Sequence, residues 1–181
     1  MLAAQSFSDF HVQDKQGWSC AHRAAAFGTA SDIKLLTKLH APLTLQTFKL
    51  SSPPIFCAAQ FGNVETFLEL TQLHPDFLLM TDVRMWTLLH VAVNIKSLQL
   101  IRLLIDLGAD PHVRSMATDY LVPEELKNIA VTPGDIALLR GPEVRLAYLE
   151  ALKVNGHTVE LWYDDSNGKE YLFWAAMDDL T

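Results

Sequence analysis

Apolar residues recur at helical spacing in four separate stretches of the chain. In each stretch they return every three or four residues, which places them on one face of an α-helix. A shorter segment that contains small residues precedes each stretch. The four amphipathic stretches are Ile33–Leu39, Val64–Leu73, Leu98–Leu107 and Val144–Leu152. The pattern therefore predicts four helix pairs, each made of a short helix and a second helix with an apolar face.

The short segments before these stretches are related by a fixed period. His22, Phe56 and His90 follow one another at intervals of 34 residues, and Asp135 marks a weaker copy 45 residues after His90. The aligned segments are 14–28, 48–62, 82–96 and 127–141. A period of this length is typical of stacked repeats, in which no single repeat can bury its apolar face alone. The sequence therefore predicts a helical solenoid.

Residue types at equivalent positions suit the ends of the predicted helices. Thr87 and Thr132 stand where a side-chain oxygen can accept an unpaired backbone N–H at a helix start. Pro133 follows at the first helical position, where its missing N–H costs little. Glycines after the first helix, Gly28 and Gly62, are expected to take the left-handed backbone of a helix C-cap.

This pattern resembles the ankyrin repeat, whose motif is roughly D-x-x-G-x-T-P-L-H-x-A-A-x-x-G, a second helix and then G-A-D. The resemblance covers about residues 14–152 and departs from the motif at Phe56, Lys96 and Asp135. It implies an all-α ankyrin-repeat solenoid of about four helix-turn-helix repeats that serves as a binding surface. The third copy carries Asp82, Thr87, Leu89, His90, Ala92 and Gly108-Ala109-Asp110.

Three segments fall outside the repeat and set the expected domain organisation. Residues 1–13 are an N-terminal cap or tail, and residues 14–154 form the repeat domain with an insertion at 116–130. Residues 155–181 are expected to form a C-terminal β-hairpin that caps the last repeat, because 157–163 and 169–175 alternate at period two on either side of Asn167-Gly168. This end also resembles the tail of small fungal ankyrin proteins. The aromatic residues expected to cover the last repeat are Trp162, Tyr163, Tyr171, Phe173 and Trp174.

Composition narrows the class of function. Half of the residues are hydrophobic, 19% are charged, and the formal net charge is −7, which argues against a nucleic-acid partner and an anionic membrane surface. Cys20 and Cys57 are both expected to be buried and reduced, as in a cytoplasmic or nuclear protein. His22 and His90 are expected to tie neighbouring turns together. The histidines and acidic residues show no metal-ligand or catalytic spacing, so the sequence predicts no cofactor, no metal and no catalytic residue.

Large side chains recur at positions that line the concave groove in this family. Trp18 and Trp86 are equivalent, and so are Phe27, Phe61 and Ile95, which predicts an apolar stripe that something must cover. We expect an intracellular scaffold that binds a protein or peptide there. The predicted partner-binding residues are Trp18, Phe27, Phe61, Arg84, Trp86, Asn94 and Ile95.

Three alternatives remain open at this stage. The insertion or the N-terminal segment could fold over the stripe within the chain. The groove and the insertion could also enclose a small apolar ligand, as a binder or as a substrate-orienting enzyme. Its polar groups would be Arg84, His112, Asp119 and Tyr120. Finally, the aromatic hairpin could dock the protein into a larger complex.

Overall fold

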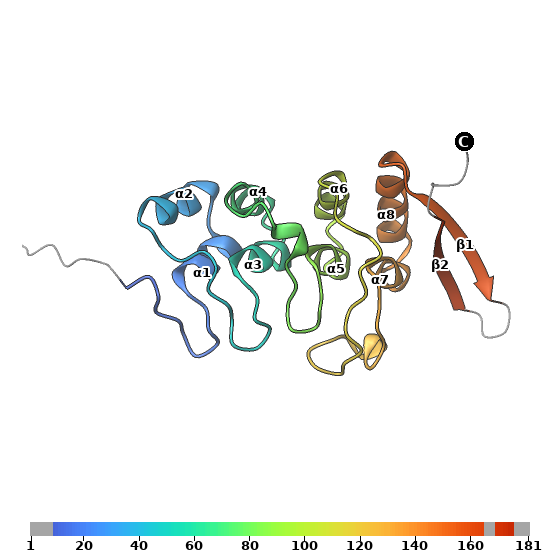
Figure 1. Ribbon diagram of the computed structural model, residues 1–181, viewed down its shortest axis with the longest axis horizontal. Coiled ribbons are helices and arrows are strands. Elements are labelled where there is room, and N and C mark those ends of the chain that lie inside the picture. Colours follow the sequence, from blue (N-terminus) through green and yellow to red (C-terminus); the bar gives the residue numbers. More distant parts are fainter. Residues whose placement is uncertain (1–8, 165–168, 176–181) are drawn as a thin grey trace, which may run out of the picture. The chain divides into compact units, whose positions relative to one another are not determined.

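The computed structural model describes residues 9–164 and 169–175, and Figure 1 shows their helices and strands. Within these residues the α-helices follow one another in four pairs. They are α1 (Cys20–Phe27) and α2 (Ala30–Lys38), α3 (Pro54–Gln60) and α4 (Val64–Leu73), α5 (Leu88–Asn94) and α6 (Leu98–Asp106), and α7 (Pro133–Arg140) and α8 (Pro142–Val154). Two short 3₁₀ helices, η1 (Phe77–Leu79) and η2 (Glu124–Leu126), lie in the connections, and the strands are β1 (Thr158–Asp164) and β2 (Lys169–Ala175).

The chain divides into two compact units, Met1–Phe77 and Leu78–Thr181. In the first unit α1 packs against α3, and α2 packs against α4. In the second unit α5 packs against α7, and α6 packs against α8. Each unit thus contains two neighbouring helix pairs, with first helices beside first helices and second helices beside second helices. This is the packing expected of ankyrin-like helical repeats.

The start of α7 confirms the capping predicted for Thr132. The Thr132 hydroxyl accepts a hydrogen bond from the Asp135 backbone N–H, and the Asp135 carboxylate accepts one from the Thr132 backbone N–H. In the third repeat, Nδ1 of His90 accepts the Thr87 backbone N–H instead. Asp135 therefore replaces the repeat histidine at the helix start without loss of the reciprocal cap.

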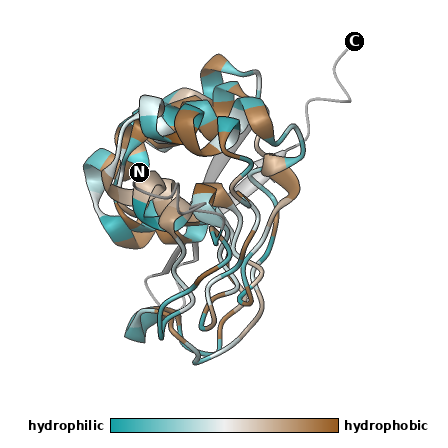
Figure 2. Ribbon diagram, turned by 90° about the vertical axis from the view of Figure 1, so that its left-hand side faces the viewer, coloured by the Kyte–Doolittle hydropathy of each residue, from teal (hydrophilic) through white to brown (hydrophobic). Residues whose placement is uncertain are grey.

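The core of each unit combines buried alanines with buried branched and aromatic residues. Ala25 and Ala58 are fully buried in the first unit, which lets the backbones of α1 and α3 approach closely. Phe67 and Leu104 are fully buried on α4 and α6. Figure 2 shows hydrophobic and hydrophilic positions alternating along the helices.

The glycines after the first helices do not all serve the same purpose. Gly62 has a φ angle of +68°, as predicted, but Gly28 has a φ angle of −91° and is not left-handed. A Cβ atom on Gly28 would lie 2.7 Å from the Ala24 carbonyl oxygen, so glycine is needed there for space. Lys96 holds the left-handed position in the third repeat, with a φ angle of +61°.

The predicted fold class needs a correction at its C-terminal end. The described chain is not all-α, because β1 and β2 pair antiparallel with Thr158 opposite Ala175. A β-hairpin cap on the last repeat is not supported: residues 165–168 and the side chains of both strands, including the predicted aromatic cover, lie outside the described residues. What the structure supports is the set of ankyrin-like helical repeats. The prediction that both cysteines are buried is also wrong, because Cys20 is exposed.

Candidate functional site

Three aromatic side chains meet on the first unit and form what we call the aromatic cluster, Trp18, Phe27 and Phe61. The Trp18 and Phe27 rings stack with their centroids 6.2 Å apart, and Phe61 stands edge-on to both, at 5.8 Å from Trp18 and 4.7 Å from Phe27. Phe27 is 65% exposed and Phe61 is 49% exposed, whereas Trp18 is half-buried. The rings therefore present one continuous apolar surface.

Repeat geometry explains why these rings meet. Phe27 is the last residue of α1, and Phe61 is the residue that follows α3 at the equivalent position of the next repeat. Since α1 and α3 pack side by side, equivalent positions at their C-terminal ends become neighbours in space. The sequence prediction that Phe27 and Phe61 share one surface is thus supported by the ring distances.

Trp18 is positioned by the turn that precedes α1. The Asp14 carboxylate accepts hydrogen bonds from the backbone N–H groups of Gln16 and Trp18, each at 2.9 Å, and from Arg23 at 2.8 Å. The backbone hydrogen bond from Trp18 is the largest of these influences, and together they lower the pKa of Asp14. The Arg23 guanidinium lies 5.8 Å from the centre of the Trp18 ring.

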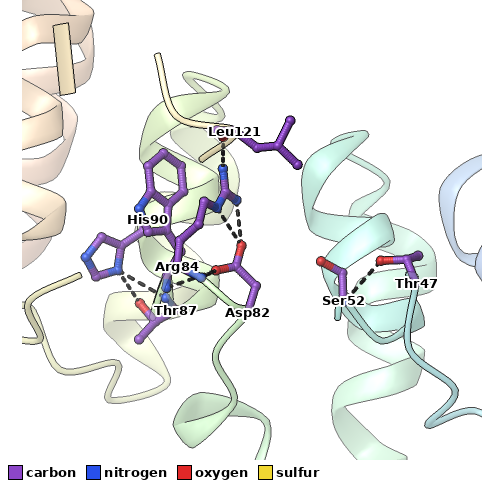
Figure 3. A network of polar contacts seen from close by, with 8 residues as sticks. Thr47, Ser52, Asp82, Arg84, Thr87, His90 and Leu121 are labelled. Carbon is purple, nitrogen blue, oxygen red and sulfur yellow. Dashed lines mark hydrogen bonds and ion pairs between the residues drawn. The ribbon is translucent and has the colours of Figure 1, made fainter. Parts of the chain in front are cut away.

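The equivalent turn of the second unit holds a buried network, shown in Figure 3. The Asp82 carboxylate accepts hydrogen bonds from Nε and Nη2 of Arg84 at 2.9 and 2.6 Å, and from the Trp86 backbone N–H at 3.2 Å. The guanidinium carbon lies 3.9 Å from the centre of the Trp86 ring. The His90 ring stacks on the Trp86 ring, and the two ring centroids are 6.0 Å apart.

The insertion is bound to this network. Nη1 of Arg84 donates a hydrogen bond to the Leu121 carbonyl oxygen at 2.7 Å, and the Met116 backbone N–H donates one to the Arg84 carbonyl oxygen at 2.8 Å. Trp86 is only 1% exposed and Arg84 is buried too. Both residues were expected at the groove as partner contacts, with cover by the insertion as an open alternative. In the second unit both side chains lie inside the fold, and Arg84 is bound to the insertion.

The remaining predicted site residues, Asn94 and Ile95, lie at the end of α5. The Asn94 side-chain oxygen accepts two hydrogen bonds from Arg140, at 3.2 Å from Nε and 2.7 Å from Nη2. Arg140 also pairs with Glu125 of the insertion. Ile95 follows α5 and is half-buried. Sequence reasoning missed Arg140, because a basic residue in the last turn of a helix carries no sign of such distant partners.

The repeat histidines connect neighbouring turns, as predicted. Nε2 of His22 lies 3.1 Å from the Ser52 carbonyl oxygen, and Nε2 of His90 lies 3.1 Å from the Val131 carbonyl oxygen. Because Nδ1 of each ring accepts a backbone N–H, Nε2 carries the proton and donates, so each ring is neutral. Burial agrees with this state, since it lowers the pKa of His22 and lowers the pKa of His90 to about 4.

Among the described residues, no group of three or more histidine, cysteine or acidic side chains is arranged to hold a metal ion. Across the same part of the chain, every helix is too short or too polar to span a bilayer.

The helices follow one another in pairs, and a buried histidine links the turn of one repeat to the turn of the next. This arrangement defines a helical-repeat protein. A protein-family model described as Ankyrin repeat matches residues 85–116, which cover α5, α6 and the flanking turns. Residues 85–116 are therefore an ankyrin repeat. No curated protein matches the chain. The resemblance of the C-terminal end to small fungal ankyrin proteins stays a prediction.

Proposed function

We propose that the first unit binds a protein or peptide partner through the aromatic cluster Trp18, Phe27 and Phe61. Ankyrin repeats are generally protein–protein interaction modules, and this chain contains such repeats. The observation that carries the proposal is the exposure of two phenylalanine rings in mutual contact, at 65% and 49% of their surface. Monomeric proteins seldom leave aromatic rings grouped and exposed unless the group serves an interaction.

The expected contribution of the cluster follows from its exposed area. Complete burial of a phenylalanine side chain contributes about 1.5–3 kcal/mol, and these two rings are each about half to two thirds exposed. Covering Phe27 and Phe61 should therefore contribute about 2–3 kcal/mol to partner binding, before any gain from Trp18. That amount corresponds to a change of about 30- to 150-fold in the dissociation constant.

Capture of a partner by two matched variants tests the proposal. In the first variant, Phe27→Ser and Phe61→Ser remove the exposed rings; in the control, Leu35→Ser and Leu68→Ser remove two other exposed apolar side chains of the same unit. A partner retained by the wild type and the control but lost by the first variant supports the proposal. Equal retention by all three proteins, at similar melting temperatures, contradicts it.

The four other predicted contacts have less support. Arg84 and Trp86 are buried against the insertion, and Asn94 is bound to Arg140, so their part in binding a partner stays a prediction. The alternative of a small apolar ligand under the insertion would use Arg84 as a polar group. That guanidinium is already engaged by Asp82 and the Leu121 carbonyl. The aromatic cluster is therefore the better supported site.

A further inference from the structure

We propose that the insertion, residues 116–130, is a built-in occupant of the predicted partner contacts of the second unit, and that its release lets a partner segment of the same chemistry bind there. This inference goes beyond the proposed function, which concerns the aromatic cluster of the first unit. The supporting observation is that the insertion is bound at the repeat positions where the sequence predicts partner contacts.

Two arginines hold the insertion at these positions. Nη1 of Arg84 donates a hydrogen bond to the Leu121 carbonyl oxygen at 2.7 Å (Figure 3). Arg140 pairs with the Glu125 carboxylate and also donates to the side-chain oxygen of Asn94. The insertion therefore reaches one predicted contact, Arg84, directly and a second, Asn94, through Arg140.

Repeat geometry makes Arg140 the counterpart of the exposed rings of the first unit. Arg140 follows Ile95 by 45 residues, which is the offset of the fourth repeat from the third, and Ile95 is equivalent to Phe27 and Phe61. In the first unit this position carries two exposed phenylalanine rings. In the second unit the Arg140 side chain is 11% exposed and is bound to the insertion. Equivalent positions are thus open in one unit and occupied in the other.

The insertion is built as a separate loop with few attachments. The Asn128 backbone N–H donates to the Thr118 carbonyl oxygen at 2.9 Å, so the two ends of the loop are close together. Within the insertion, all of which the structure describes, Leu126 is the only buried residue. Leu121 has a left-handed φ angle of +51°, which is unfavourable for leucine and persists because contacts such as the Arg84 hydrogen bond impose it. A loop with so few buried contacts opens more readily than the packed helices.

The attachments of the insertion define the chemistry of a partner segment that replaces it. Such a segment needs a carboxylate for Arg140 directly before a leucine, as in Glu125-Leu126, and a backbone carbonyl a few residues earlier for Arg84. Because the insertion belongs to the same chain, it competes at an effective concentration of about 1 mM. A segment that binds the opened surface with a dissociation constant of about 100 μM should therefore bind the intact protein about tenfold more weakly.

Fluorescence anisotropy with a labelled peptide of residues 118–128 tests the proposal on the full chain. Two open variants are compared with the wild type: one replaces residues 119–127 by a glycine-serine linker of the same length, and the other carries Glu125→Gln with Leu126→Ala. We expect the linker variant to bind the peptide at least tenfold more tightly than the wild type, and the second variant to show a smaller gain. Glu125→Gln in the peptide, or Arg140→Gln in the linker variant, should weaken this binding about tenfold.

Each outcome decides for or against the proposal. Equal binding by the wild type and by every open variant that keeps the helical circular dichroism signal would overturn it. If the linker variant does not fold, the doubly substituted variant decides. A gain in binding that ignores both Glu125→Gln in the peptide and Arg140→Gln in the protein would also overturn it. Phe27→Ser with Phe61→Ser, added to the linker variant, should leave the gain unchanged, so the result is independent of the aromatic cluster.

Discussion

Removing the cation from the buried pair of Asp82 and Arg84 should cost far more stability than removing Arg23 from the exposed pair that the equivalent aspartate, Asp14, makes in the first repeat. The Asp82 side chain is fully buried and that of Arg84 is 7% exposed, whereas the Asp14 and Arg23 side chains are 36% and 63% exposed. Replacing Arg84 with alanine leaves a buried carboxylate without its cation, which typically costs about 3–5 kcal/mol. Breaking an exposed pair costs about 0.2–1 kcal/mol.

The structure indicates that the loss of stability on Arg84→Ala lies near the lower end of the range of about 3–5 kcal/mol. After Arg84→Ala, the Asp82 carboxylate still accepts the backbone N–H groups of residues 84 and 86, at 2.8 and 3.2 Å. The Leu121 carbonyl belongs to an exposed residue, so water can replace the lost guanidinium there. The guanidinium contact with the Trp86 ring is lost as well. We therefore expect Arg84→Ala to lower the free energy of unfolding by about 3 kcal/mol.

Urea unfolding followed by far-UV circular dichroism measures this difference. Arg23→Ala is the matched control, with an expected loss below about 1 kcal/mol. Because the cost comes from the unpaired Asp82 carboxylate, the double variant Asp82→Asn with Arg84→Met should lose less than the sum of its single substitutions. Equal losses for Arg84→Ala and Arg23→Ala, or additive losses in the double variant, would refute the reasoning.

Three further predictions concern a histidine, a left-handed position and the thiols. Burial lowers the pKa of His90 to about 4 in the folded protein, whereas a histidine of the unfolded chain titrates near the ordinary value of 6.5. As the pH falls from 6.5 towards 4, the unfolded chain binds this proton before the folded protein does. The free energy of unfolding should therefore be about 2 kcal/mol lower at pH 5 than at pH 7.5. Urea unfolding at both pH values should show a smaller change for His90→Gln. Lys96→Gly should raise the melting temperature, because relief of the left-handed backbone contributes about 1 kcal/mol, whereas Gly62→Ala at the equivalent position should lower it. Iodoacetamide should modify Cys20 in the native protein and leave Cys57 unmodified, because Cys57 is buried and burial raises the pKa of its thiol to about 12. Mass spectrometry of the treated protein measures both modifications. Equal modification of the two thiols would contradict the buried position of Cys57.

Features that depend on neighbouring residues in the chain could be predicted from the sequence. Thr132 caps α7 because its hydroxyl needs only a backbone N–H three residues away. The roles of His22 and His90 were implied by the resemblance to the ankyrin repeat, in which both residues occupy the histidine of the turn. Gly28 was misread, because its need for space depends on how closely the turn approaches Ala24 rather than on a left-handed backbone.

The environments of Trp18 and Trp86 show what could not be predicted from the sequence alone. Both tryptophans occupy the same repeat position, and in both turns an aspartate accepts the tryptophan backbone N–H, so local sequence predicts the same environment. The tertiary structure makes them different, because Arg84 reaches Leu121, 37 residues further along the chain, and joins the insertion to the network over Trp86. The period by itself determined which side chains share a surface within a unit. Only the long-range contacts of the insertion decided that Trp86 is buried while the rings beside Trp18 remain exposed.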